Sequence, residues 1–323
     1  MILTVTPNPS LDRTYEIPSL DRGAVLRAEG DRVDPGGKGV NVSRVVSAAG
    51  LRTTAVLPLG GATGTLLAGL LGIEGVDVTA VSVAGRTRSN VSLVEPDGTL
   101  TKVNSPGPEL SAQESALLLE TVRTCAGSPD WIACCGSLPP GLGPGWYAEL
   151  VERAHEAGAR VALDTSGAAL LAALPARPDL VTPNAVELAE AVGRPLATLG
   201  DVLKAAEELR SLGAGAVLAT LGADGQLLVS AEGAFHGTAP AEAVRSSVGA
   251  GDASLAGFLI AAGPDGPAAG RPARALASAL AHGAAAVRLP GSAMPTPADL
   301  RPGAVHLSQE PPLDLPLSQP AAL

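Results

Sequence analysis

Apolar and polar positions alternate in two different ways along this chain. From residue 105 onward, short apolar runs alternate with Ala-, Leu- and Glu-rich segments of helical period. This alternation is typical of a mostly parallel sheet whose strands are joined by crossover helices. We expect strands at 131–135, 160–163, 180–182 and 216–220, and helices at 111–124, 145–157, 184–192, 202–212, 251–262 and 271–287. Two last strands, at 226–230 and 234–238, should form an antiparallel edge.

The first hundred residues follow the second pattern. A buried strand at 2–5 precedes alternating polar and apolar stretches near 14–17 and 25–33, and a second pair at 90–95 and 99–104 is joined by a Pro-Asp-Gly turn. A glycine cluster and an amphipathic helix lie between the pairs. Strands with polar faces, inserted in pairs, predict a small sheet that stands off the main body as a lid. Lids exclude water from a reaction.

The domain organisation follows from these two patterns. We expect one α/β domain over residues 1–306, with lid strands inserted at about 14–33 and 88–104. A Pro-rich tail at 307–323 should be an irregular appendage.

Composition and charge restrict the possible ligands. The 323 residues are 46% hydrophobic and 17% charged, so the chain can bury a core and is not a disordered polypeptide. Aromatic residues are only 2%, which leaves almost nothing for stacking nucleic-acid bases. The net charge of −10 opposes nucleic acid and anionic membranes at long range. A phosphorylated ligand would therefore need a local cluster of cations.

Cysteines, histidines and the N-terminus argue for a cytoplasmic protein. Cys125, Cys134 and Cys135 are an odd number, and the two adjacent ones should point to opposite faces of a strand, so a disulfide framework is not expected. The histidines lack the spacing of a zinc site. The sequence has no apolar run of membrane-spanning length, and we expect no secretory leader.

The run from Val248 to Asp252 stands directly before an apolar segment of helical period. Small residues at a helix N-terminus let backbone N–H groups converge on one point, where the helix dipole favours an anion. An acid beside such a pocket can take a proton while the pocket stabilises a transferring phosphoryl group. Asp is also favoured as a plain helix cap, so this stretch alone leaves both interpretations open.

Neither glycine cluster completes a common nucleotide motif. Ser254 stands where a dinucleotide fingerprint needs its third glycine, and Gly39 stands where a P-loop needs Ser or Thr. The cluster at 36–39 still places Lys38 in a turn that opens a helix, with Asn41 just inside it. Such a turn suits a phosphate, and a plain loop with a solvated lysine fits it equally.

Polar residues follow several expected strands. Asp12 comes after the strand at 2–5 and Ser137 after that at 131–135, and the carboxyl ends of parallel strands carry ligands. Asp12 could hold sugar hydroxyls or form an Asx turn. Asn184 and Glu187 share one side of a helix start, where they could orient hydrated Mg²⁺ or form a solvated face.

Four cations lie in or near the expected lid. Arginine forks match phosphate oxygens in pairs, which suits a clamp for a phosphate group. Scattered surface arginines are the alternative interpretation. The four residues are Arg27, Lys38, Arg86 and Arg88.

Taken together, the motifs resemble the PfkB carbohydrate kinase family from residue 1 to about 300. They are, in order, TPNPSLD ending at Asp12, GGKGVNVSR at 36–44, GRTRSNVSLVE at 85–95, GSLPPG at 136–141, DTSG at 164–167, PNAVEL at 183–188, TLGADG at 220–225 and VGAGDAS at 248–254. The resemblance is greatest to the branch of 1-phosphofructokinases and tagatose-6-phosphate kinases. It implies a ribokinase-like three-layer α/β/α sandwich with a mostly parallel sheet and a small β-sheet lid.

The resemblance also implies a role for each candidate site residue. The base that takes the proton of the attacking hydroxyl would be Asp252, with an anion hole formed by Gly249, Ala250 and Gly251. The sugar hydroxyls would be held by Asp12, Gly37, Asn41 and Ser137. The phosphate already on the sugar would be clamped by Lys38, Arg88 and Arg27. The phosphates of ATP and Mg²⁺ would be organised by Asn184 and Glu187, with Glu187 acting on the metal through water, and the nucleotide side would be lined by Thr220, Gly222 and Gly225.

The implied reaction is ATP-dependent phosphorylation of a ketohexose phosphate. Fructose 1-phosphate, giving fructose 1,6-bisphosphate, is the first expected substrate, with tagatose 6-phosphate or fructose 6-phosphate as alternatives. Thr182 stands where many relatives have lysine, which removes one charge from the nucleotide side. A catalytically silent sugar-phosphate sensor is opposed by the intact Asp252, and a Rossmann oxidoreductase by the failed glycine fingerprint. The resemblance further implies a homodimer in which the lids meet.

Overall fold

The structure is a computed structural model that describes residues 1–125, 130–241, 243–263 and 272–321. Within these residues the main sheet has ten strands, in the order β15-β14-β13-β12-β10-β9-β8-β1-β4-β5. The strands from β12 to β5 are parallel, and β13, β14 and β15 complete the sheet with antiparallel pairing. The bounds are β1 (Ile2–Val5), β4 (Thr53–Leu59), β5 (Asp77–Ser82), β8 (Trp131–Cys135), β9 (Arg160–Asp164), β10 (Leu180–Val181), β12 (Val217–Thr220), β13 (Gln226–Ser230), β14 (Gly233–Thr238) and β15 (His306–Ser308). The mostly parallel sheet and its antiparallel edge are confirmed.

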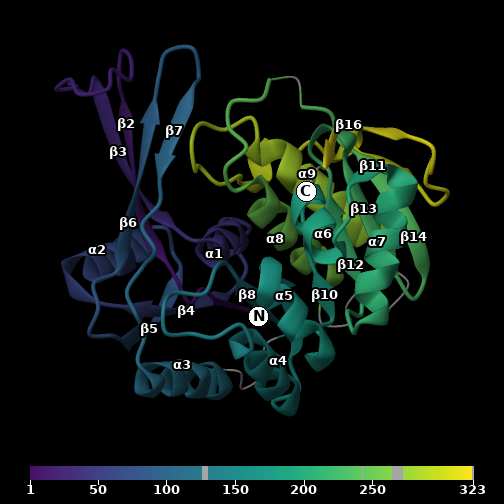
Figure 1. Cartoon of the computed structure of the whole chain (residues 1–323), viewed down its shortest axis with the longest axis horizontal. Coiled ribbons are helices and arrows are strands. Elements are labelled where there is room, and N and C mark those ends of the chain that lie inside the picture. Colours follow the sequence, from purple (N-terminus) through teal and green to yellow (C-terminus); the bar gives the residue numbers. More distant parts are fainter. Residues whose placement is uncertain (126–129, 242, 264–271, 322–323) are drawn as a thin grey trace.

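Helices cover both faces of this sheet and complete a three-layer α/β/α sandwich (Figure 1). One face carries α1 (Lys38–Ala48), α2 (Gly61–Ile73), α8 (Ala250–Ala262) and α9 (Pro272–Ala286). The other carries α3 (Ala112–Cys125), α4 (Trp146–Glu156), α5 (Gly167–Ala173), α6 (Ala185–Val192) and α7 (Leu199–Ser211). Residue 271, the expected start of the last helix, lies outside the described residues.

The central strands are buried on both faces because helices pack on each side of them. In β8, Ile132 and Cys134 belong to the core under α4, whereas Trp131 and Cys135 belong to the core under α8. The adjacent cysteines therefore point to opposite faces, and each of the three cysteines is a free thiol. In the described part of the chain, no helix combines the length and apolarity needed to cross a membrane.

The lid is a separate four-stranded sheet in the order β3-β2-β6-β7, and it projects from the main body at the upper left of Figure 1. Its strands are β2 (Ser10–Glu16), β3 (Gly30–Gly36), β6 (Arg88–Val94) and β7 (Leu100–Val103). The lid prediction is confirmed, but β2 begins earlier and β3 later than the alternation indicates. Asp12 consequently lies inside a lid strand, and the alternative of an Asx turn is wrong.

The described part of the C-terminal tail, up to residue 321, contains strand residues that pair with the main body, so the expectation of an irregular appendage from residue 307 is wrong for this part. β15 adds to the edge of the main sheet, and β16 (Pro316–Ala321) pairs antiparallel with β11 (Leu196–Thr198). Leu317 and Ala321 are buried in the core beneath α6 and α7. Pro316 is tolerated because it begins its strand.

Candidate active site

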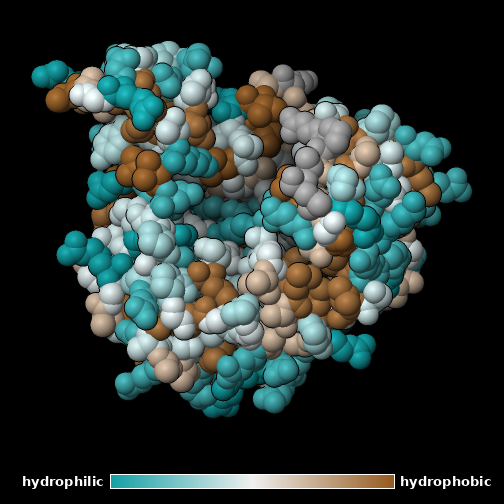
Figure 2. Space-filling view, viewed as in Figure 1, coloured by the Kyte–Doolittle hydropathy of each residue, from teal (hydrophilic) through white to brown (hydrophobic). Residues whose placement is uncertain are grey.

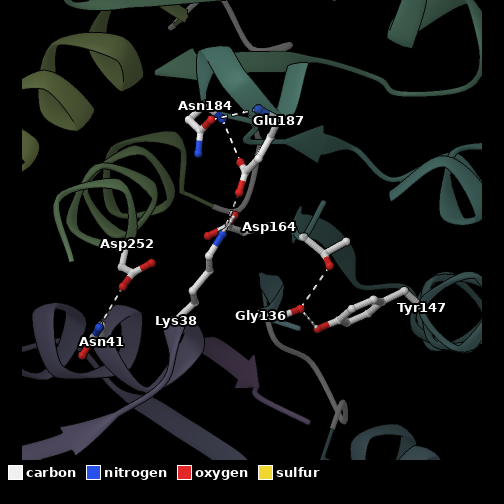
Figure 3. A network of polar contacts seen from close by, with 9 residues as sticks. Lys38, Asn41, Gly136, Tyr147, Asp164, Asn184, Glu187 and Asp252 are labelled. Atoms are coloured by element: carbon white, nitrogen blue, oxygen red, sulfur yellow. Dashed lines mark hydrogen bonds and ion pairs between the residues drawn. The ribbon is translucent and has the colours of Figure 1, made fainter. Parts of the chain in front are cut away.

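The N-termini of three helices converge on the carboxyl end of β9. Lys38 begins α1, Glu187 lies in the first turn of α6, Asp252 lies in the first turn of α8, and Asp164 ends β9 (Figure 3). A hollow with a hydrophilic floor separates the lid from the main body in the space-filling view (Figure 2). Helix N-termini and parallel-strand ends are the parts of such sheets that hold anionic ligands.

Asp252 is buried, with 7% of its surface exposed, and it does not cap its helix. The N-cap is Gly249, in the left-handed region at φ 76°, and a Cβ there would clash with the end of the Met294 side chain. Oδ2 of Asp252 instead accepts a hydrogen bond from Nδ2 of Asn41 at 2.8 Å. The interpretation of Asp252 as a plain cap is therefore wrong. No side chain of the described residues caps α8, whose first two residues are Ala250 and Gly251.

The surroundings of Asp252 move its pKa toward neutrality. Burial, followed by the negative charge of Asp164, raises the pKa of Asp252 to about 7. The hydrogen bond from Asn41 and the charge of Lys38 oppose that rise. A carboxyl group with such a pKa exists in both protonation states near neutral pH, which is the condition for exchanging a proton with a ligand.

Lys38 bridges two carboxylates. Its Nζ lies 2.9 Å from Oδ1 of Asp164 and 3.5 Å from Oε1 of Glu187. Burial acts to lower the pKa of Lys38, but the two carboxylates raise it above the ordinary lysine value. Lys38 is therefore a permanent cation in this site. The idea of a plain solvated loop lysine is wrong.

Asn184 and Glu187 form a capping box at the start of α6. The backbone N–H of Glu187 donates to Oδ1 of Asn184, and the backbone N–H of Asn184 donates to Oε2 of Glu187, both at 2.9 Å. The second carboxylate oxygen, Oε1, faces Lys38, and only 17% of the Glu187 side chain is exposed. Glu187 is thus directed into the site rather than out to solvent.

Asp164 was not identified as a site residue from the sequence. It is 5% exposed, and the only signal for it was its place in the DTSG motif at a predicted strand end. Its position is fixed through Gly136, whose N–H donates to the Asp164 carbonyl at 2.8 Å. The Gly136 carbonyl in turn accepts from Oη of Tyr147 (Figure 3). It also accepts from Oγ1 of Thr165. Neither of these two donors was expected from the sequence.

The lid contributes a second cluster of polar side chains, which lies on one face of β2 and β6. Oδ1 of Asp12 accepts from Oγ of Ser10 at 2.7 Å and from Nδ2 of Asn90 at 3.0 Å. Arg88 donates from Nη1 to the Ser105 carbonyl at 2.9 Å, while its buried Nε has no partner among the described residues. Burial lowers the pKa of Arg88 and Asp12 opposes this. An unpaired buried donor marks a place for an acceptor.

The other residues expected to bind the sugar phosphate differ in how they are placed relative to these polar groups. Gly37 precedes α1 at φ 121°, and a Cβ there would press on Thr6. Ser137 is exposed, and its Oγ accepts from Nδ2 of the buried Asn8 at 3.4 Å. Arg27 is exposed in the segment between β2 and β3 and forms no hydrogen bond or ion pair with the residues described. The structure therefore does not join Arg27 to this group within one chain.

Among the residues expected to line the nucleotide, Thr220 forms an isolated parallel bridge with Asn184, which brings β12 and α6 together. Gly222 and Gly225 both have positive φ values, 60° and 89°, and a Cβ on Gly225 would clash with the Gly237 carbonyl. Oγ1 of Thr182 is buried without a partner among the described residues. In the described part of the chain, no cluster of three or more His, Cys, Asp or Glu residues is placed to bind a metal directly.

Comparison with known proteins agrees with this architecture. Residues 8–299 match the pfkB family carbohydrate kinases. The chain is 41% identical to the 1-phosphofructokinase of Rhodobacter capsulatus over 81% of this chain and 83% of that protein, and 40% identical to that of Haloferax volcanii over 81% and 84%. The chain belongs to the pfkB carbohydrate kinase family.

Solved structures support the same conclusion. Phosphofructokinase-2 from Escherichia coli superimposes with a TM-score of 0.85 at 34% identity, covering 92% of this chain and 96% of that one. A possible 1-phosphofructokinase from Thermotoga maritima gives 0.82 at 27% identity, covering 96% and 100%. The ribokinase of Arabidopsis thaliana superimposes with a TM-score of 0.73 at 24% identity, covering 92% of this chain and 96% of that one, so the ribokinase-like fold is confirmed. The protein is a sugar-phosphate kinase of the 1-phosphofructokinase type.

Proposed function

We propose that the protein phosphorylates fructose 1-phosphate with ATP, giving fructose 1,6-bisphosphate and ADP. The observation that carries this proposal is the buried Asp252 at a helix N-terminus that no side chain of the described residues caps, opposite a lid that bears Arg88. Relatives with 34–41% identity carry the name 1-phosphofructokinase. The intact acid and its surroundings oppose a catalytically silent sensor.

In this proposal Asp252 is the general base. Its Oδ2 accepts a hydrogen bond from Asn41, so Oδ1 is the atom that receives the proton of the free primary hydroxyl of the sugar. The hydroxyl oxygen attacks the γ-phosphorus of ATP as the bond to the ADP oxygen breaks, with no covalent enzyme intermediate. Backbone N–H groups of Gly249, Ala250 and Gly251 stabilise the charge on the transferred group.

The sugar is held between the main body and the lid. Asp12 accepts hydrogen bonds from sugar hydroxyls on the lid side, assisted by Gly37, Asn41 and Ser137. Arg88 binds the phosphate already present on the sugar, because its buried Nε has no acceptor among the described residues. Lys38 adds positive charge near this phosphate. Arg27 can contact the phosphate only if the lid of one molecule packs against the lid of a second molecule.

The nucleotide side can accommodate ATP with Mg²⁺. Magnesium usually keeps several waters and takes one or two carboxylates plus substrate phosphates. Glu187 and Asp164 supply such carboxylates beside the cation of Lys38, so the residues present fit a hydrated ion. Bound Mg²⁺ would neutralise phosphate charge. Asn184 positions Glu187 through the capping box, and Thr220, Gly222 and Gly225 line the nucleotide.

We further propose that the protein is a cytoplasmic homodimer joined through the lids. The lid strands and the segment between β2 and β3 expose four large apolar side chains, Leu20, Val25, Leu100 and Val103, and one of these, Val25, is 84% exposed. Hydrophobic side chains gathered on a small sheet favour contact with a second copy. A monomer by light scattering at assay concentration would overturn the dimer without affecting the proposed reaction.

A coupled assay with fructose 1-phosphate, fructose 6-phosphate and tagatose 6-phosphate tests the substrate. We expect the highest kcat/KM for fructose 1-phosphate. The 6-phosphates are the second candidates, because a 6-phosphofructokinase from Mycobacterium tuberculosis is 34% identical over 80% of this chain. A tenfold preference for either 6-phosphate would reverse the assignment, and binding without turnover of any of them would favour a sensor.

A further inference from the structure

Arg44 is a buried arginine one helical turn beyond Asn41, and the proposed reaction leaves it without a role. Only 7% of its surface is exposed. Nε and Nη2 donate to the two oxygens of Glu74 at 2.6 and 3.1 Å, and Nη1 donates to the Ser292 carbonyl at 2.9 Å. Nη1 also donates to Oδ1 of Asn41 at 3.3 Å. The guanidinium is therefore held by an acid and a carbonyl while it faces Asn41.

The contact between Arg44 and Asn41 decides which end of the amide faces Asp252. An asparagine amide has an acceptor oxygen and a donor nitrogen, whereas a guanidinium has only donors. The oxygen of Asn41 must therefore face Arg44, which leaves Nδ2 to donate to Asp252 at 2.8 Å. The flipped amide would set NH₂ against guanidinium and carbonyl against carboxylate, and both contacts would be repulsive.

The orientation of Asn41 changes the proton affinity of Asp252. Three charged groups act on Asp252 from the elements around it, namely Asp164 on β9, Lys38 on α1 and Glu187 on α6. The buried thiol of Cys135 on β8 faces the same region and stays neutral, because burial and the neighbouring negative charges raise its pKa. None of these groups forms a hydrogen bond with the Asp252 carboxylate among the described residues, whereas Asn41 does. A donated hydrogen bond stabilises the ionised form and lowers the pKa, opposing the rise caused by burial and by Asp164.

We propose that Arg44 is a positioning residue that locks the Asn41 amide so that its nitrogen faces Asp252, keeping the carboxylate ionised and Oδ1 directed to the substrate. Arg44 itself touches no substrate. The inference rests on the proposed function, in which Asp252 must be deprotonated before it accepts the hydroxyl proton. The relay runs from Glu74 through Arg44 and Asn41 to Asp252.

Two readouts on Arg44→Met test this proposal, one of them independent of turnover. The ¹³C carboxyl shift of Asp252, followed against pH in the free protein, should titrate about one pH unit higher than in wild type. At a pH well below the midpoint of the titration, a pKa higher by one unit means that the variant has tenfold less ionised Asp252 than wild type. The acid limb of kcat/KM should move up by the same amount, with little change in sugar KM. Arg44→Lys, which keeps a donor, should recover part of both shifts.

Glu74→Gln provides a second variant if Arg44→Met does not fold. Glu74 is partly exposed, and the substitution loosens the guanidinium without removing it. A smaller shift in the same direction is expected. Arg153→Met is the matched control, because it removes an arginine–glutamate pair on α4 that has no link to Asn41. It should leave both readouts unchanged.

The outcomes separate this inference from the proposed function. An unshifted Asp252 titration in folded Arg44→Met, or in Glu74→Gln if the former is unfolded, overturns the role of Arg44 even if activity or melting temperature falls. A wild-type protein inactive on all three sugar phosphates refutes the proposed function, while the titration still decides the positioning role.

Discussion

Lys38 and Asp164 are 126 residues apart and form an ion pair with 2.9 Å between Nζ and Oδ1. This ion pair joins the start of α1 to the end of β9, and the arrangement of the site depends on this connection. Lys38→Met would leave Asp164 and Glu187 without their cation, which should cost about 1–3 kcal/mol of unfolding free energy, between the values for exposed and buried pairs. Denaturant unfolding measures this, with the exposed Lys204→Met as the control. Equal stability of the two variants would contradict a structural role for the pair.

Replacing the proposed base should affect turnover far more than binding. Asp252→Asn is expected to lower kcat by roughly 10²–10⁴-fold, because the amide cannot accept the hydroxyl proton. The affinity for the sugar phosphate, measured by calorimetry, should change little. Asp201→Asn is the matched control, since Asp201 also lies in a first helical turn but forms a capping box with Thr198. If both variants keep full kcat, Asp252 is not the base.

The pKa of Asp252 predicts a pH dependence of stability. Its folded pKa of about 7 lies above the ordinary 3.8, so between about pH 4 and 7 the folded protein holds a proton that the unfolded chain has lost. The free energy of unfolding should therefore fall as pH rises through this window. Asp252→Asn lacks this titration, so wild type should lose stability relative to the variant from pH 4 to 7. A constant difference would mean that the pKa is not raised.

Arg88 should act on sugar-phosphate binding. Arg88→Ala removes charge-assisted hydrogen bonds and is expected to raise the sugar-phosphate KM by roughly ten- to hundredfold while kcat changes less. Arg86→Ala is the control, because Arg86 belongs to the same motif but is exposed and lies outside β6. Initial rates at varied sugar phosphate decide the matter. Equal KM values for the two variants would remove Arg88 from the phosphate clamp.

We expect the tail to contribute to stability and to nucleotide binding. Leu317→Ala should cost about 2–3 kcal/mol because Leu317 is buried in β16. The exposed Leu313→Ala should cost much less. The backbone N–H of Ser318 donates to Asp224 at 2.8 Å, in the turn that carries Gly222, so deletion of β16 should also raise the KM for ATP. A tail deletion with unchanged melting temperature would show that the strand is dispensable.

Most of the main sheet after residue 105 could be predicted, because strands buried on both faces and amphipathic helices leave clear patterns. The region from β4 to β5 was not assigned from the sequence. Its helix α2 contains four glycines, a composition that disfavours helix. The structure explains Gly64, where a Cβ would press on Thr87 and Leu59. Such close packing between elements has no signature in a local pattern.

The amino-acid sequence by itself determined the layered α/β architecture, the lid insertions and the motifs that carry the family, because these depend on periodicity and on residue types at short spacing. Only the tertiary structure decided that Asp252 is bonded to Asn41 rather than capping α8, that Lys38 faces two carboxylates and that Arg44 orients an amide. The physical reason is distance along the chain. Charges and hydrogen bonds act through a few ångströms of space, and Asn41 and Asp252 are separated by 211 residues of sequence.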